Sequence, residues 1–259
     1  MHEGRHRARP EGARRPRGQR SRRVRRHRRA GQGRARSLIT SRDNERLKLV
    51  RKLRDRRWRD KLGLFVVEGE DLVEAAGIEP VELLVAGENV EPALLAEVSE
   101  LAHPPRVIAV YRRGDLPRVT RAATLALWHV GDPGNVGTLL RAADAFGAGI
   151  ALSEGCADPT GPKALRASAG SIFRVPVGGF DEPAGRRIAL VARGGEPLGD
   201  VDLAGEVVFV LGAEREGLPD DVVARCDAAA TIPLAGGAES LNVAMAGTVA
   251  LYELAHRDR

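Results

Sequence analysis

In the second half of the chain, short apolar runs alternate with segments in which apolar residues recur at helical spacing. The apolar runs are predicted strands at 125–130, 150–152, 174–177, 188–192, 207–211 and 231–234. Helices are predicted to end at Phe146, to begin near Lys163, and to span 220–225 and 240–256. Near-continuous apolar strands between helices are typical of a parallel sheet that is covered on both faces. The pattern therefore predicts an α/β domain at 123–259.

The preceding segment begins with a predicted amphipathic helix at 44–59 that has one basic face. Apolar residues recur there near helical spacing, among many cations, at Leu47, Val50, Leu53 and Trp58. Shorter elements follow, with strands predicted at 64–67, 81–85 and 107–110 and helices at 71–76 and 92–101. The alternation predicts a small α/β domain at 37–111. A charged linker at 112–122, with Gly114 and Pro117, joins it to the second domain.

Positive charge is concentrated at the N-terminal end. Residues 1–36 contain 15 Arg and two acids, and 37–61 contain ten Lys or Arg and four acids, so the rest of the chain is acidic although the total is +6. The first segment has almost no large apolar side chain and is predicted to be disordered. Three interpretations stay open: an arm that binds RNA phosphates, a solvated tail with no dedicated role, or an upstream start codon that was wrongly chosen. The charge distribution places any polyanion contact at the N-terminal end of the chain.

Composition excludes several other classes. No apolar run is long enough for a membrane-spanning helix, and the N-terminus lacks the apolar stretch of a secretory signal, so a cytoplasmic protein is expected. Cys156 and Cys226 have no C-x-x-C spacing, which gives no support to a disulfide framework or a zinc site. A Walker A lysine pattern and a G-x-G-x-x-G after a strand are both missing, which disfavours ATP hydrolysis and dinucleotide binding.

Three loops that follow predicted strands carry the candidate chemistry. They are Asp132-Pro-Gly-Asn-Val-Gly137 with Arg141 in the next helix, Gly212-Ala-Glu-Arg-Glu-Gly-Leu218, and Ile232-Pro-Leu234 followed by Ser240-Leu-Asn242. Glycines let a backbone approach a ligand closely, and a helix N-terminus offers free N–H groups to an anion. The carboxyl ends of parallel strands are also where such sheets bind ligands. Each loop alone is a weak signal.

In this order and spacing, the loops resemble the three signature motifs of the SpoU (TrmH-like) RNA 2′-O-methyltransferases of the SPOUT superfamily. The first motif contains Asn135, Gly137, Arg141 and Ala145-Phe-Gly147; the second contains Gly212-Ala-Glu214 and Gly217; the third contains Ile232-Pro233 and Ser240-Leu-Asn242. Residues 39–76, with Phe65-Val-Val-Glu-Gly69, also resemble the small substrate-binding domain that many of these enzymes carry. The Arg-rich tail departs from the family pattern.

The resemblance implies a trefoil knot in the C-terminal domain, a homodimer and S-adenosyl-L-methionine as the cofactor. It implies that the substrate is structured RNA, with ribosomal RNA favoured over tRNA, and that the protein does not bind a membrane. Cofactor contacts in the family are largely backbone groups, which implies a binding rim formed by Leu211, Gly212, Ile232, Leu234 and Leu241. For the basic segment of the small domain, the candidate RNA contacts are Arg42, Asn44, Lys48, Arg51 and Arg54.

The implied reaction is in-line attack of a ribose 2′-oxygen on a sulfonium methyl group, in which the protein aligns the reactants and assists proton loss. The candidate catalytic residues are Asn135, Arg141, Glu214, Ser240 and Asn242. Family proposals make Arg141 the base. A guanidinium stays protonated at ordinary pH, so Arg141 is either an unusual base or a clamp for the adjacent phosphate. Glu214 is expected to position its loop.

Other functions of the same fold remain open from sequence. A tRNA 2′-O-methyltransferase would use the same residues. A non-catalytic RNA-binding or ribosome-assembly protein is disfavoured because Asn135, Arg141, Glu214, Ser240 and Asn242 are all present. A base or protein methyltransferase is the weakest alternative. The target nucleotide, and a housekeeping as opposed to a drug-resistance role, cannot be read from the residues.

Overall fold

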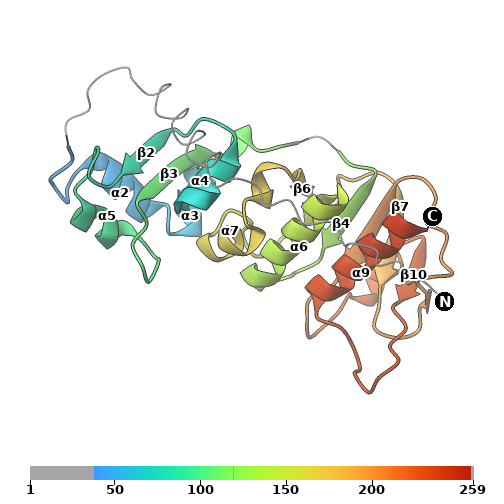
Figure 1. Ribbon diagram of the computed structural model, residues 1–259. Helices are drawn as coiled ribbons and strands as arrows, with labels where there is room; N and C mark the ends of the chain where they lie inside the picture. The colour runs from blue at the N-terminus through green and yellow to red at the C-terminus, as the bar shows by residue number, and fades with distance from the viewer. Residues whose placement is uncertain (1–37, 119, 258–259) are drawn as a thin grey trace, which may run out of the picture. The chain divides into compact units, whose positions relative to one another are not determined.

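The computed structural model describes residues 38–118 and 120–257 (Figure 1). The arginine-rich segment 1–36, predicted to be disordered, lies outside the described residues. Two sheets organise the described residues, one in an N-terminal part, 38–115, and one in a C-terminal part, 120–257. The two parts are described in turn.

The N-terminal part has a three-stranded antiparallel sheet in the order β1-β3-β2. Its strands are β1 (Leu64–Glu68), β2 (Glu82–Val85) and β3 (Val107–Arg112). Its helices are α2 (Glu45–Lys52), α3 (Arg56–Leu62), α4 (Glu70–Ala76), α5 (Pro92–Val98) and the 3-10 turn η1 (Arg113–Asp115). Leu47, Val50 and Leu53 are buried in one apolar cluster with β3, as their spacing predicts.

The single helix predicted at 44–59 is wrong, because the segment forms two helices. Asn44 caps α2 by accepting a hydrogen bond from the Arg46 N–H, and Asp55 caps α3 in the same way with the Arg57 N–H. An aspartate side chain that binds a nearby backbone N–H competes with the continuing helix and starts a new one. Trp58 lies beyond this break and outside the apolar cluster that Leu47, Val50 and Leu53 join.

The C-terminal part has a seven-stranded sheet in the order β6-β5-β4-β9-β7-β10-β8, in which every neighbouring pair is parallel. Its strands are β4 (Ala123–Leu127), β5 (Gly149–Leu152), β6 (Val177–Gly179), β7 (Arg186–Leu190), β8 (Glu196–Pro197), β9 (Val207–Leu211) and β10 (Ala228–Thr231). Its helices are α6 (Pro133–Phe146), α7 (Pro162–Ser168), the 3-10 turn η2 (Ser171–Phe173), α8 (Asp220–Val223) and α9 (Val243–His256). No helix of the described part is long and apolar enough to cross a membrane.

Apolar residues of the central strands face two different clusters, which confirms the predicted sheet with cover on both faces. Leu125, Leu127, Phe209 and Leu211 join the larger cluster, on the face of α6 and α9, while the alternating residues Ala126, Val208 and Val210 join a second cluster with Val222 of α8. Figure 1 shows α6 and α9 side by side against the sheet, and the two helices are in contact. The trefoil knot stays a prediction.

Several predicted boundaries differ from the structure, including those of the last strand, the terminal helix and the strand predicted at 174–177. The last strand lies at Ala228–Thr231, not at 231–234. The prediction misses its start because three consecutive alanines have low strand propensity and give no strand signal. The terminal helix begins at Val243, not at 240, since Asn242 is its N-cap. The strand predicted at 174–177 is β6, which begins at Val177 after η2.

A buried ionic network joins α3 and η1 to the loop before α7. Asp158 accepts hydrogen bonds from Nε of Arg59 at 2.7 Å, from Nη2 of Arg113 at 2.8 Å and from the Thr160 hydroxyl at 2.7 Å. Arg59 is 5% exposed and Asp158 is 8% exposed. The partners therefore satisfy a charge pair that water cannot reach, and the network fixes α3 against the C-terminal part.

Candidate active site

A pocket of about 310 Å³ lies at the carboxyl ends of β7 and β9, beside β10. Its lining includes all the residues predicted as the cofactor rim, namely Leu211, Gly212, Ile232, Leu234 and Leu241. Glu214 and Ser240 also line it. The structure thus brings the second and third loops together around one cavity, of a size typical for small ligands.

Gly212 allows the second loop to fold back on itself. A Cβ atom at this position would lie 2.2 Å from the backbone carbonyl of Gly217 and 2.5 Å from the Leu218 nitrogen. The Gly217 N–H donates to the Ala213 carbonyl at 2.9 Å, which closes the loop. Only glycine permits this approach of two backbone segments, so the shape of this pocket wall depends on it.

Asn135 connects the three loops through its side-chain amide. Its Nδ2 donates to Glu214 of the second loop, and its Oδ1 accepts a hydrogen bond from Asn242 Nδ2, in the third loop, at 3.2 Å. Asn242 also caps α9 by accepting from the Ala244 N–H at 2.9 Å. Glu214 and Asn242 are exposed and Asn135 is half-buried, so this three-residue chain lies where a large substrate can reach it.

The N-terminus of α6 holds Asn135 in place. Asp132 is the N-cap and accepts a hydrogen bond from the Asn135 N–H at 3.0 Å. The Lys163 ammonium, 3.0 Å away, and this N–H together hold the pKa of Asp132 below its ordinary value, so the cap stays ionised. Gly137 lets α7 pack closely on α6, because a Cβ there would be 2.5 Å from the Ala164 carbonyl oxygen.

Arg141 is exposed on α6 and is not part of the hydrogen-bonded group of Glu214, Asn135 and Asn242. Among the described residues it makes no hydrogen bond or ion pair. It lies six residues after Asn135, which is about 9 Å further along the helix axis and on another side of the helix. The structure therefore joins Asn135, Glu214 and Asn242 directly, places Ser240 in the pocket wall, and leaves Arg141 free to contact another molecule.

The predicted RNA contacts of the N-terminal part all have partners within the chain. Asn44 is the cap of α2, and Arg51 donates to the Arg42 carbonyl oxygen at 2.8 Å. The other three cations form ion pairs: Arg42 with Glu97, Lys48 with Glu45, and Arg54 with Glu100. Their contact with RNA stays a prediction.

His129 is a feature that sequence reasoning missed. Its place at the end of a predicted strand suggests a packed imidazole; the residue is exposed, and its ring stacks on Trp128 with ring centroids 4.8 Å apart. Its backbone has φ +52°, in the left-handed region that few residues other than glycine adopt. Strained backbone of this kind clusters at functional sites, and His129 lies just before the first loop. Nothing in the sequence signals this conformation.

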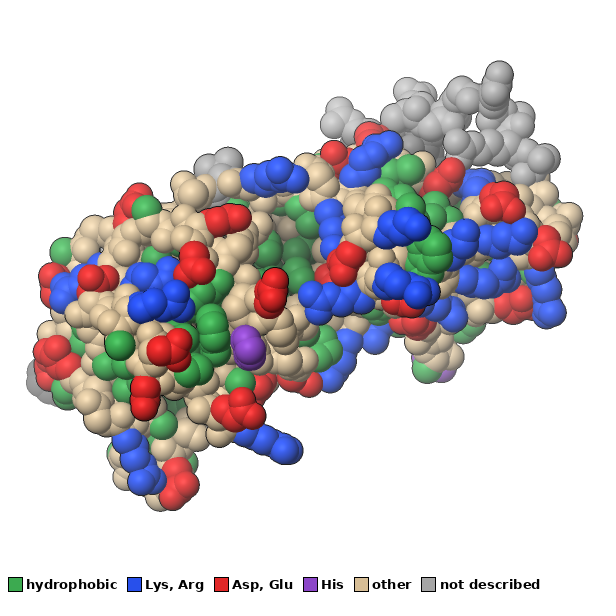
Figure 2. All heavy atoms as spheres, turned by 180° about the vertical axis from the view of Figure 1, so that it is seen from behind, with side chains coloured by type: hydrophobic (Ala, Val, Ile, Leu, Met, Phe, Trp, Pro, Cys, Tyr) green, Lys and Arg blue, Asp and Glu red, His purple; other side chains and the backbone are tan. Residues whose placement is uncertain are grey.

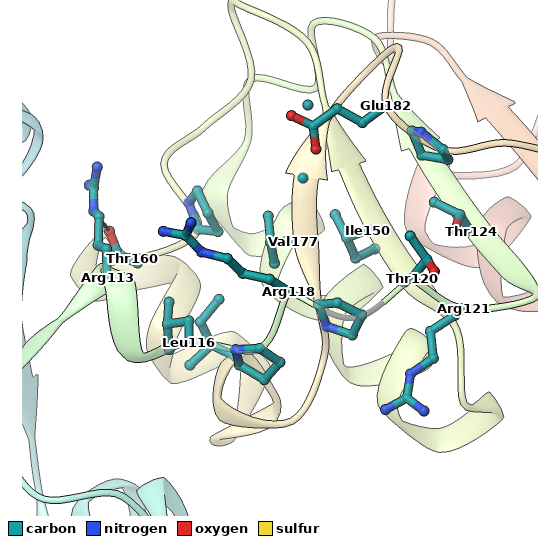
Figure 3. Close-up of a pocket in the computed structure, with 18 of the residues that line it drawn as sticks. Arg113, Leu116, Arg118, Thr120, Arg121, Thr124, Ile150, Thr160, Val177 and Glu182 are labelled. Atoms are coloured by element: carbon teal, nitrogen blue, oxygen red, sulfur yellow. Dashed lines mark hydrogen bonds between the residues drawn. The ribbon is translucent and has the colours of Figure 1, made fainter.

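A larger cavity, of about 550 Å³, lies at the amino ends of strands of the same sheet (Figure 3). Thr124, Ile150 and Val177 contribute to it from near the starts of β4, β5 and β6. Figure 3 shows Arg118 extending across the cavity and Arg121 pointing away from it. None of the residues predicted for catalysis, cofactor or RNA lines this cavity. The smaller pocket, formed by the second and third loops and linked through Asn135 to the first, is therefore the candidate active site.

Family models match both parts of the chain. The model of the SpoU rRNA Methylase family matches residues 122–252, about half of the chain and all three loops. The chain belongs to the SpoU rRNA methylase family. The MRM3-like substrate binding domain model matches residues 44–113. Family membership, predicted from the three loops, is confirmed.

Relatives of this family resemble the chain over most of its length. The 23S rRNA (guanosine(2553)-2′-O)-methyltransferase RlmP of Bacillus subtilis is 32% identical over 243 residues, covering 83% of this chain and 98% of the relative. An uncharacterized tRNA/rRNA methyltransferase of Synechocystis is 31% identical over 257 residues, covering 83% and 92%. The AdoMet-bound rRNA methyltransferase of Sinorhizobium meliloti has a TM-score of 0.74 and 29% identity, covering 86% and 98%.

Proposed function

We propose that the protein transfers the methyl group of S-adenosylmethionine to a ribose 2′-hydroxyl of ribosomal RNA. The observation that carries the proposal is the hydrogen-bonded chain of Glu214, Asn135 and Asn242, which joins the three family loops beside the pocket. Residues 123–259 act as the catalytic domain and 37–111 as the RNA-binding domain, joined by the linker 112–122. A ribosomal substrate implies a cytoplasmic location.

S-adenosylmethionine is the cofactor, and the pocket fits it. The residues Leu211, Ile232, Leu234 and Leu241 give apolar walls for the cofactor, and Gly212 places backbone without a side chain in the same lining. When bound, the cofactor supplies an electrophilic methyl group. The protein residues then have to hold the attacking ribose in line.

The catalytic roles follow from position. Asn135 is the hub, because its amide holds Glu214 and Asn242 at fixed orientations next to the pocket. Ser240, in the pocket wall, offers a hydroxyl to the cofactor carboxylate or to the ribose. Arg141 is a phosphate clamp, because it is exposed and unpaired in the described chain, and a guanidinium binds phosphate through two parallel hydrogen bonds.

A homodimer is supported by an apolar stripe on α9. Met245, Val249 and Tyr252 lie three and four residues apart and are 58%, 38% and 55% exposed. An exposed stripe of this kind marks an association surface, and a second copy of α9 provides the same surface. Sedimentation velocity should give a dimer for the wild type and a monomer for Tyr252→Glu. A monomeric wild type at micromolar concentration would contradict the dimer.

The proposal is tested by transfer of labelled methyl groups to unmodified 23S rRNA and, in parallel, to bulk tRNA. The wild type should label 23S rRNA, and Arg141→Ala should lose most of this activity because the phosphate next to the ribose is no longer held. Arg166→Ala, which removes a cation from α7, is the matched control and should remain active. Labelling of tRNA alone would favour the tRNA enzyme, and RNA binding without transfer to either RNA would favour the non-catalytic alternative.

A further inference from the structure

Three cations lie around the ring of Trp58. Lys52 Nζ, Arg57 Cζ and Lys61 Nζ lie 5.4, 5.6 and 5.1 Å from the centroid of its ring. The ring is half-buried and belongs to none of the three apolar clusters of the described residues. Cations at these distances are attracted to the negative face of an indole. Trp58 therefore holds Lys52, Arg57 and Lys61 close together, and the four residues are called the Trp58 cluster.

The charges of this cluster are largely unneutralised. Within the described chain, Lys52 and Lys61 have no carboxylate at ion-pair distance, and Arg57 has only Asp55, at 3.7 Å, with both side chains more than half exposed. An exposed pair of that kind contributes little. By contrast, Arg42, Lys48 and Arg54 on and beside α2 each have a glutamate partner. Three like charges held around one ring repel one another and favour a polyanion.

The cluster also has a fixed position relative to the pocket. Arg59, the residue after Trp58, is bound to Asp158 of the C-terminal part, and Arg56 donates to the Cys156 carbonyl oxygen at 3.0 Å. Both contacts attach α3 to the loop that follows β5. Figure 2 shows Lys and Arg side chains gathered over the N-terminal part, on the face opposite to that of Figure 1.

We propose that the Trp58 cluster anchors the phosphate backbone of the substrate RNA and carries more of the binding than the paired cations of α2. Lys52, Arg57 and Lys61 contact phosphates, and Trp58 is a positioning residue that keeps the three charges together. Because α3 is fixed to the C-terminal part, phosphates on the cluster are held at a constant distance from the active site. The inference rests on the proposed function for the identity of the polyanion.

Two triple variants of the full chain test the proposal. Lys52→Gln/Arg57→Gln/Lys61→Gln and Arg42→Gln/Lys48→Gln/Arg54→Gln remove the same number of charges. Binding to unmodified 23S rRNA is measured from 50 to 200 mM salt. The slope of log K against log [salt] is negative, and the cluster variant should reduce its magnitude by about two, since each phosphate contact contributes roughly 0.7 to 0.9. The α2 variant should reduce it by clearly less. Equal slopes for the two variants would overturn the proposal.

A single substitution tests the role of the ring. Trp58→Leu should weaken RNA binding by about threefold to tenfold, raise KM for RNA and leave kcat and the unfolding midpoint unchanged, while Trp58→Phe should restore most of the affinity. An unchanged KM would show that the ring only packs. The two proposals fail differently: a wild type that binds RNA with the expected salt slope but transfers no methyl group contradicts only the proposed function.

Discussion

Replacing Asp158 with alanine is expected to lower the free energy of unfolding by about 3–5 kcal/mol. The substitution leaves the guanidinium of Arg59, which is 5% exposed, without its carboxylate partner. It also removes the acceptor for Arg113 and for the Thr160 hydroxyl. An uncompensated buried charge costs far more than a lost surface contact. Urea denaturation followed by circular dichroism gives the change directly.

Glu239→Ala is the control for this prediction. Its ion pair with Arg193 is exposed, with 85% and 76% of the two side chains accessible, and such pairs contribute about 0–1 kcal/mol. A similar small effect for both variants would mean that water reaches the Arg59 and Asp158 pair.

The same network predicts loss of stability in acid. Burial raises the pKa of Asp158, but the Thr160 hydrogen bonds and the charges of Arg113 and Arg59 outweigh it, so the pKa is lowered on folding. The stabilisation is therefore complete above the unfolded-state pKa, about 3.9, and is lost as the pH falls through the folded value. Asp158→Asn should lack this part of the acid dependence, which urea curves between pH 3 and pH 7 would reveal.

Asn135→Ala is expected to reduce kcat for methyl transfer by about 100-fold, because misplacement of aligned groups by about 1 Å has an effect of that size. The variant separates Glu214 from Asn242. Asn135 does not line the pocket, so affinity for S-adenosylmethionine should change little. Steady-state kinetics and calorimetric titration of the cofactor measure the two effects.

Thr138→Ala, on the same helix, is the matched control for Asn135→Ala. Among the described residues, its hydroxyl donates only to the Gly134 carbonyl oxygen, at 2.8 Å, so kcat should be nearly that of the wild type. Equal losses of kcat in the two variants would show that α6 has shifted as a whole. A large loss of cofactor affinity in Asn135→Ala would contradict the proposal that Asn135 acts by orienting Glu214 and Asn242.

The strands and the pocket rim could be predicted because their signals are local. Continuous apolar runs mark strands that are buried on both faces, such as β9, and the loops at their carboxyl ends then have to meet. The residues around the candidate pocket were predictable because Gly212 and its neighbours follow such a strand. The link from Asn135 to Glu214, 79 residues later, was not predictable from spacing alone.

The features that sequence reasoning missed depend on tertiary contacts. From sequence, Arg59 is predicted to be an exposed cation of a basic helix. Its burial is explained by its partner Asp158, 99 residues later. From sequence, Trp58 is predicted to lie on the apolar face of a single helix. In the structure Asp55 caps a new helix, α3, which contains Trp58. His129 has an uncommon backbone conformation that no local pattern reports.

The central claim is methyl transfer to the ribose 2′-oxygen, and analysis of the labelled nucleosides tests it most directly. Ribosomal RNA labelled by the wild type is digested to nucleosides, and the position of the label is identified by chromatography and mass spectrometry. The account predicts a single 2′-O-methylnucleoside, whose 3′-phosphodiester resists alkaline cleavage because the 2′-hydroxyl is blocked. Label on a base-methylated nucleoside, with normal alkaline cleavage, would contradict it.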